Sequence, residues 1–257
     1  MKHEPTFLHQ NKPLVTCMVQ ATNPDTMINL IHNALYDGCD AFGFQMERLD
    51  PAYQTDETVT NLFSHMKGRP IYATNYRVFS NTEKSDEEIA NGLIRLRELG
   101  ATLIDVLGDL YAPSQYEITY DKTAIEKQKA LIDRLHGMGA EVLMSSHTFR
   151  FMSGEEVLAI AREHQARGAD ISKIVTFAES EEEELENLKT TALLRRELDI
   201  PFLFLSGGTH YKLHRTIGPM LGACMWLTVQ TQDECSTKIQ PICRAMRTVA
   251  DTIDFLY

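Results

Sequence analysis

Short apolar segments alternate with longer amphipathic segments along the chain, which is the pattern of a parallel β-sheet covered by helices. Eight apolar segments have the length and composition of β-strands. They span residues 14–20, 41–46, 70–76, 102–107, 141–147, 171–177, 201–205 and 221–229. The pattern therefore predicts eight successive strand-helix units.

The joints between these units carry residues that end or begin helices. A glycine precedes several predicted strands, where a helix can end in a left-handed residue; these are Gly38, Gly100, Gly139 and Gly168. Helix starts are indicated by three pairs with capping-box spacing and by a capping asparagine before a proline: Ser85 with Glu88, Ser153 with Glu156, Ser180 with Glu183, and Asn23 with Pro24. Both kinds of signal support the alternation of strands and helices.

Eight such units in 257 residues match the usual size of a (β/α)8 TIM barrel, and we expect one barrel domain over residues 1–257. An open, doubly wound sheet is the alternative. Its nucleotide-binding versions carry Gly-x-Gly-x-x-Gly or Gly-x-x-x-x-Gly-Lys-Ser/Thr, and neither motif occurs here. The acidic run 181–184 is interpreted as the first turn of a helix, where carboxylates suit the helix dipole. We therefore favour the barrel.

Charge and hydropathy narrow the classes of partner. The formal net charge is -11 and no block of Lys or Arg occurs, so nucleic acid is a poor candidate partner. No apolar run is long enough to span a bilayer, and the segment from Met1 to Pro13 is polar. We expect a soluble cytoplasmic protein that does not bind membranes.

The cysteines indicate neither a disulfide framework nor a zinc site. The chain has 5 of them, scattered and without a Cys-x-x-Cys pair. Reduced and mostly buried thiols are the simplest interpretation, and no metal site is predicted.

Two polar residues lie at the ends of neighbouring predicted strands, where a barrel carries its reacting groups. Along residues 141–147, a period of two places Leu143, Ser145 and His147 on one side, with His147 at the mouth if that side is the lumen. Lys173 lies inside an otherwise apolar strand. Desolvation there disfavours the ammonium, and a neutral amine is the form that attacks a carbonyl. We therefore predict a Schiff base on Lys173, with His147 transferring protons.

Each residue taken alone has a simpler interpretation. A histidine at a strand end is more often a hydrogen-bonded structural residue, and a strand lysine can snorkel from an edge or from the bottom of a barrel. Adjacent parallel strands lie about 5 Å apart, so the two side chains can meet over one substrate. Their occurrence together on neighbouring strands favours catalysis.

The segments around these residues carry a family resemblance. Residues 145–149 read Ser-Ser-His-Thr-Phe and residues 168–174 read Gly-Ala-Asp-Ile-Ser-Lys-Ile. In order and spacing they resemble type I 3-dehydroquinate dehydratases, whose fifth strand ends in Ser-x-His and whose sixth carries Gly-Ala-Asp-x-x-Lys. The resemblance extends from Leu14 to the C-terminal region and is weaker in the first half.

The resemblance implies further site residues near the C-terminus. It implies a glycine-rich turn at residues 206–208, an arginine at Arg215 that grips the substrate carboxylate, and a glutamine at Gln240 in the last loop. Taken alone, Arg215 could be a surface residue and Gln240 a helix cap. The family also implies 3-dehydroquinate as substrate, no metal or organic cofactor, and a homodimer.

The first half departs from the family pattern. The family ends its second strand in Glu-x-Arg, whose carboxylate orients the catalytic histidine; here Gln45 or Glu47 is expected in that place. The third strand supplies Arg77, with no glutamate before Glu83, and the fourth has Leu107 where the family has a glutamate. In the last loop, Lys-Ile replaces Pro-Gly at 238–239. Gln45, Glu47 and Arg77 are expected to contact the substrate, with altered substrate scope or rate.

The sequence thus predicts a Schiff-base lyase that dehydrates 3-dehydroquinate or a related cyclic hydroxy-keto acid. One alternative is an aldolase-like enzyme that uses the same lysine on another keto acid, which the rewritten strand ends motivate. A second alternative is a non-catalytic binding protein on an inherited barrel.

Overall fold

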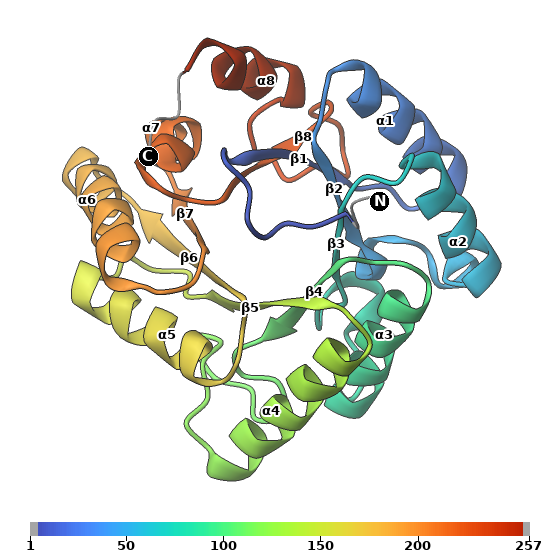
Figure 1. Cartoon of the computed structure of the whole chain (residues 1–257), viewed down its shortest axis with the longest axis horizontal. Helices are drawn as coiled ribbons and strands as arrows, with labels where there is room; N and C mark the ends of the chain where they lie inside the picture. Colours follow the sequence, from blue (N-terminus) through green and yellow to red (C-terminus); the bar gives the residue numbers. More distant parts are fainter. Residues whose placement is uncertain (1–4, 254–257) are drawn as a thin grey trace.

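The computed structural model describes residues 5–253 and contains eight parallel strands inside a ring of helices (Figure 1). The first four residues of the polar N-terminal segment and the last four residues of the chain lie outside the described range. The strands are β1 (Leu14–Val19), β2 (Ala41–Gln45), β3 (Ile71–Thr74), β4 (Leu103–Leu107), β5 (Glu141–His147), β6 (Ile171–Ala178), β7 (Phe202–Gly208) and β8 (Met225–Val229).

Each strand pairs with its neighbour along the chain from β1 to β7, and β8 returns to pair with β1. The ladder between β5 and β6 sets Ser145 opposite Lys173. β7 and β8 form the two edges of the sheet, and the Cys224 N–H donates to the Phe202 carbonyl at 2.8 Å across the gap before β8. The sheet is therefore a nearly closed barrel, and the (β/α)8 prediction is confirmed.

The helices alternate with the strands and cover the outside of the ring (Figure 1). They are α1 (Pro24–Tyr36), α2 (Asp56–His65), α3 (Asp86–Glu98), α4 (Lys122–Gly137), α5 (Gly154–Ala166), α6 (Glu181–Glu197), α7 (Lys212–Ile217) and α8 (Cys243–Thr252). Short 3-10 helices are η1 (Met46–Arg48), η2 (Pro51–Tyr53), η3 (Phe79–Asn81) and η4 (Gly218–Leu221).

The predicted helix ends are largely confirmed. The side chains of Asn23, Ser85 and Ser153 accept from backbone N–H groups of their first turns, and the last two complete capping boxes. The glycines that end helices adopt positive φ: Gly38, Gly100, Gly139 and Gly168. Ser180 is an exception, because the Glu183 carboxylate accepts from the Glu179 N–H at 2.7 Å and leaves the box half formed.

Several predicted strand ends were wrong, including those of β3, which spans 71–74 rather than 70–76, and β7, which spans 202–208 rather than 201–205. β8 begins at Met225 because Leu221 ends the 3-10 helix η4, and Gly222 follows with φ of 129°. β2 ends at Gln45 because η1 begins at Met46. This turn breaks the period-two alternation just before Glu47, so that residue leaves the sheet.

The core has two layers that follow the alternation of the strands. Tyr72, Leu143, Ile171 and Leu203 pack together in a cluster that draws side chains from successive strands, as the inward positions of a barrel do. Residues one position along, such as Met144, belong to the cluster that packs the strands against the helices. The barrel interior is therefore filled below the level of the polar strand ends.

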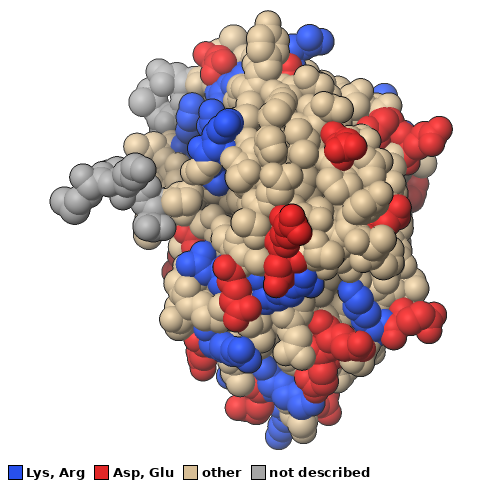
Figure 2. Space-filling view, turned by 90° about the vertical axis from the view of Figure 1, so that its right-hand side faces the viewer, with Lys and Arg blue, Asp and Glu red and all other residues tan. Residues whose placement is uncertain are grey.

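The surface is mixed in charge. On the face in Figure 2, acidic and basic side chains are interspersed. Within residues 5–253, every helix is too short or too polar to span a bilayer. All five cysteines lie in this range and are free thiols, of which Cys17, Cys39 and Cys243 are buried.

Candidate active site

A cavity of about 250 Å³ opens at the C-terminal ends of the strands. Its lining includes Gln45, Thr74 and His147, the last residues of β2, β3 and β5. The loop between β8 and α8 covers part of it through Thr237 and Gln240. This is the end of the barrel at which the reacting groups of such folds lie.

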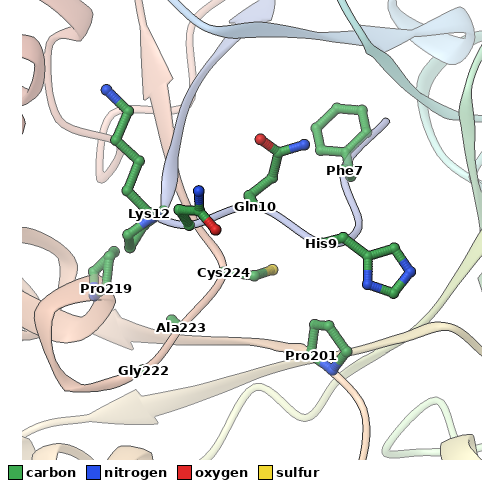
Figure 3. A pocket seen from close by; sticks show the side chains of 11 residues that line it. Phe7, His9, Gln10, Lys12, Pro201, Pro219, Gly222, Ala223 and Cys224 are labelled. Atoms are coloured by element: carbon green, nitrogen blue, oxygen red, sulfur yellow. The ribbon is translucent and has the colours of Figure 1, made fainter. Parts of the chain in front are cut away.

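A larger depression, of about 580 Å³, lies at the opposite end of the barrel (Figure 3). Its lining includes Pro13, Pro201 and Cys224, each directly before a strand. The segment that carries Phe7 and His9 crosses this end, and the Phe7 N–H donates to the Glu141 carboxylate at 2.8 Å. Residues 7–13 therefore cover the bottom of the barrel.

Lys173 lies in β6 with only 4% of its surface exposed, and its Nζ opens on the upper cavity. Nζ donates to the Tyr72 hydroxyl at 2.9 Å, the Tyr76 hydroxyl at 2.6 Å and Asp105 Oδ2 at 3.3 Å. An ammonium has three N–H donors, and each has an acceptor here. The buried amine predicted from the sequence is thus fully hydrogen-bonded in place.

Asp105 organises the groups around this amine. Tyr72 and Tyr76 both donate to Oδ2, and the Ser145 hydroxyl donates to Oδ1 at 2.5 Å. Burial, reinforced by the nearby Asp105 carboxylate, raises the pKa of both tyrosines well above the usual range. Both side chains are therefore neutral phenols near pH 7, able to donate to Asp105 while accepting from Lys173.

His147 ends β5 and is held by a carboxylate. Glu117 Oε2 lies 2.6 Å from His147 Nδ1 and also accepts from the His147 backbone N–H at 3.0 Å. A carboxylate on Nδ1 favours the tautomer that leaves Nε2 as the acceptor for substrate protons. The Tyr76 ring meets the imidazole edge-on, with centroids 5.4 Å apart. Tyr76 therefore contacts both Lys173 and His147.

The loop between β4 and α4 brings Glu117 to the imidazole. The Glu117 carbonyl accepts from the Ser146 hydroxyl at 2.7 Å. A Cβ on Gly108 would lie 2.6 Å from that same carbonyl, so this close approach requires glycine. The expectation that Gln45 or Glu47 orients His147 is therefore wrong, because the partner comes from a different loop.

Gln45 and Glu47 belong to a hydrogen-bond network at the wall of the cavity. The Glu47 carboxyl is fully buried and accepts from Thr74 at 2.8 and 3.0 Å and from Gln45 at 3.2 Å. Burial raises the pKa of Glu47 to about 7. Gln20 donates to Gln45 and to the Thr237 hydroxyl, the latter at 2.9 Å. Gln45 lines the cavity, and Glu47 lies behind it, outside the lining.

Arg215 lines the cavity from α7 and is nearly buried, with 6% exposed. Its Nε donates to the Ser206 carbonyl at 2.6 Å. Burial lowers its pKa to about 10, which leaves it charged near pH 7. Within residues 5–253, no carboxylate lies within ion-pair distance of it, so the guanidinium keeps donors for an anionic group.

Gln240 also lines the cavity, and its buried Oε1 has no hydrogen-bond partner in the described part of the chain. Arg77 is placed differently. It forms ion pairs with Asp86 at 2.6 Å and Asp109 at 2.8 Å and does not line the cavity. Arg77 is held between two carboxylates, and its geometry does not support a substrate contact.

Sequence reasoning missed the partners of both reactive groups. Asp105 and Tyr72 carried a usable signal, because polar groups at inward positions of neighbouring strands can meet across the barrel. Glu117 carried none, since it lies 30 residues from His147 in a loop without regular periodicity.

Comparisons with known proteins show the family of the chain. A family model described as type I 3-dehydroquinase matches residues 15–254. A 3-dehydroquinate dehydratase of Shouchella clausii is 27% identical over 202 residues, covering 77% of this chain and 73% of the relative. A 3-dehydroquinate dehydratase of Klebsiella pneumoniae is 28% identical over 67% of this chain, but the match spans 64% of the relative, just under two thirds.

Solved structures of similar fold include a 3-dehydroquinate dehydratase from Geobacillus kaustophilus, with a TM-score of 0.78 and 20% identity over 93% of this chain and 90% of that one. A type I 3-dehydroquinate dehydratase from Clostridium difficile gives a TM-score of 0.77 and 18% identity over 94% and 92% of the two chains. At these identities the structural likeness shows the fold alone.

Proposed function

The chain belongs to the type I 3-dehydroquinase family, a family of lyases, and we propose that it dehydrates 3-dehydroquinate to 3-dehydroshikimate through a Schiff base on Lys173. The observation that carries the proposal is that Lys173 and His147 line one cavity, with Glu117 on the far nitrogen of the imidazole. This chemistry requires an amine, a base and a group that orients the base.

The reaction begins with attack of the Lys173 amine on the substrate ketone, which loses water to give an iminium. The iminium withdraws electrons and acidifies the neighbouring carbon. His147 removes a proton there and then protonates the departing hydroxyl, which leaves as water. Hydrolysis of the conjugated iminium releases the enone and restores the lysine. Because the iminium is the electron sink, the reaction requires no metal or organic cofactor.

Three residues are proposed to hold the substrate. Arg215 binds the carboxylate through guanidinium N–H groups that have no acidic partner among residues 5–253. Gln240 hydrogen-bonds a ring hydroxyl or a carboxylate oxygen, which would satisfy its unpartnered Oε1 or use its amide donors. Gln45 is proposed to contact the substrate from the opposite wall, since it lines the same cavity. Glu47 acts through Gln45 and Thr74, which line the cavity.

The cell location and assembly belong to the same proposal. Family membership supports a cytoplasmic enzyme that forms a homodimer. Size-exclusion chromatography with light scattering tests the assembly, and a monomeric mass would contradict it.

The decisive experiment supplies 3-dehydroquinate to the purified chain and follows the ultraviolet band of a conjugated enone. In parallel, borohydride is added and the reduced adduct is located by peptide mass spectrometry. We expect the band to grow and the adduct to map to Lys173. The exposed Lys189 is a matched control, because Lys189→Ala should keep both signals.

Two outcomes would replace the proposal. An adduct on Lys173 without an enone, together with cleavage of another keto acid, would favour the aldolase-like alternative. Failure to label Lys173 with any cyclic keto acid would favour a binding role.

A further inference from the structure

We infer that Tyr76 is the acid-base residue for formation of the iminium, passing protons between the substrate oxygen and Asp105, so that His147 serves the later elimination. The inference rests on the proposed Schiff base at Lys173. It assigns a catalytic role to a tyrosine that lies just beyond β3, in the segment between β3 and η3.

Iminium formation requires proton transfers at the two atoms that react. The nitrogen must lose protons, and the ketone oxygen must gain them before it leaves as water. Within residues 5–253, the hydrogen-bond partners of Lys173 Nζ are Tyr72, Tyr76 and Asp105, and His147 is not among them. The groups nearest the nitrogen are therefore two phenols and one carboxylate.

Tyr76 has the geometry to serve the oxygen as well. Its hydroxyl lies 2.6 Å from Nζ, the shortest of the three contacts, and it donates to Asp105 Oδ2. The ketone oxygen is attached to the carbon that Nζ attacks, so it comes within hydrogen-bond reach of the same hydroxyl. Both tyrosines line the cavity, but Tyr76 is partly exposed whereas Tyr72 is fully buried. The substrate oxygen therefore meets Tyr76 first.

The addition step proceeds with balanced charges. The Lys173 ammonium gives a proton to Asp105, and the neutral nitrogen bonds to the ketone carbon. The carbonyl electron pair moves to oxygen, which takes the Tyr76 proton, and Tyr76 recovers a proton from Asp105. The result is a protonated carbinolamine, a neutral phenol and an Asp105 carboxylate.

The loss of water repeats the relay. The carbinolamine nitrogen gives a proton to Asp105, its lone pair forms the carbon-nitrogen double bond, and the hydroxyl leaves with the Tyr76 proton as water. Tyr76 again recovers its proton from Asp105. Ketone and ammonium have become iminium and water, and both protein groups have returned to their starting forms.

The separate roles of Tyr76 and His147 follow from their hydrogen bonds. An iminium nitrogen keeps one N–H donor where the ammonium had three, so Schiff-base formation releases hydroxyls that Lys173 had held. Tyr76 then keeps its bond to Asp105, and its ring already contacts the imidazole. His147 keeps its bond to Glu117 throughout and is available for the carbon proton.

The test measures adduct formation separately from elimination. In a His147→Ala background, where elimination is slow, the enzyme is mixed with 3-dehydroquinate and quenched with borohydride at increasing times. The fraction of Lys173 reduced is read by intact mass. Adding Tyr76→Phe should slow adduct formation by about 10²-fold, within the range of general acid catalysis.

Tyr72→Phe in the same background is the matched control. It removes one hydroxyl from the same Lys173 and Asp105 cluster, so it carries a similar structural cost. We expect it to slow adduct formation by about threefold or less. In the His147-containing enzyme, Tyr76→Phe should slow adduct formation and, because it is the reverse reaction, hydrolysis of the product iminium. Conversion of the substrate adduct into the conjugated adduct, read by rapid quench and intact mass, should keep the parent rate.

The outcomes separate the two proposals. If Tyr76→Phe and Tyr72→Phe slow adduct formation equally, or if neither does, the role of Tyr76 is overturned while the Schiff base stands. If the parent enzyme forms no adduct with 3-dehydroquinate, the proposed function fails and this inference fails with it.

Discussion

The two halves of the site are built from different kinds of structure. The amine half consists of groups on strands or directly after one: Lys173 on β6, Tyr72 on β3, Asp105 on β4 and Ser145 on β5, with Tyr76 two residues beyond β3. The imidazole half depends on a loop, since Glu117 reaches His147 from the segment between β4 and α4. Strand register places the first half, and loop conformation places the second.

This difference explains how the site tolerates altered strand ends. The carboxylate that the family carries at the end of the second strand is missing here, yet the imidazole still has an acidic partner. A loop can supply such a group without disturbing a closed ring of hydrogen-bonded strands. Exchange of a strand residue that contacts Lys173 would change a packed, buried cluster.

The largest expected effect is on the amine half. Lys173→Ala should abolish enone formation, by at least about 10³-fold, because no other lysine within residues 5–253 lines the cavity. His147→Ala should still form the adduct and process it slowly. Steady-state rates and borohydride labelling check both, with circular dichroism as the control for folding. A residual Lys173→Ala rate within about tenfold of the parent would rule out covalent catalysis.

Substitutions in the imidazole half should reduce activity less than substitutions in the amine half. Glu117→Gln keeps the size of the side chain but removes the charge that fixes the tautomer of His147. We expect kcat to fall by about 10- to 100-fold while labelling of Lys173 persists. The exposed Glu155 serves as a control through Glu155→Gln. Equal kcat in both variants would show that the loop carboxylate does not orient the base.

Substrate anchoring should affect affinity more than turnover. Arg215→Lys keeps the positive charge but loses the planar fork that suits a carboxylate. We expect KM for 3-dehydroquinate to rise about tenfold, with a smaller change in kcat. The exposed Arg244 provides the matched variant Arg244→Lys. An unchanged KM would place the carboxylate elsewhere in the cavity.

The smallest expected effect concerns stability and lies at Glu47. Its carboxyl has a folded-state pKa of about 7, above the usual value of 4.5, so the folded protein holds a proton that the unfolded chain releases. Stability from this group is present at acidic pH and declines as pH rises from about 5 to above 7, by about 2 to 3 kcal/mol.

Glu47→Gln should remove that dependence, because the amide does not titrate. Urea unfolding at pH 5 and pH 8 measures it, and the parent should lose more stability between the two values than the variant. Equal losses in parent and variant would show that the carboxyl titrates normally.

Much of the fold could be read from local signals. The glycines at helix ends, the serine caps and the apolar strands act over a few residues. The groups that interact are therefore close in sequence as well as in the folded structure. Strand ends were less predictable. The turn of η1 after Gln45 depends on packing between η1 and its neighbours, and no local pattern in the sequence predicted it.

In the candidate site, too, some residues could be predicted from local signals and others could not. Lys173 could be found because a lysine inside an apolar strand is costly unless it is used, and His147 because it ends the neighbouring strand. Their placement in one cavity agrees with this reasoning. Arg77 carried a similar local signal, but two carboxylates from other segments hold it away from the cavity lining.

The sequence by itself determined the barrel, the lysine buried within a strand and the histidine at a strand end, since hydrophobic periodicity and residue chemistry act locally. Tertiary structure alone decided which carboxylates serve them. Asp105 reaches Lys173 across the interior of the ring, and Glu117 reaches His147 from a loop anchored by its backbone. Contacts between residues distant in the chain depend on the closure of the ring and the course of its loops, which no short stretch of sequence encodes.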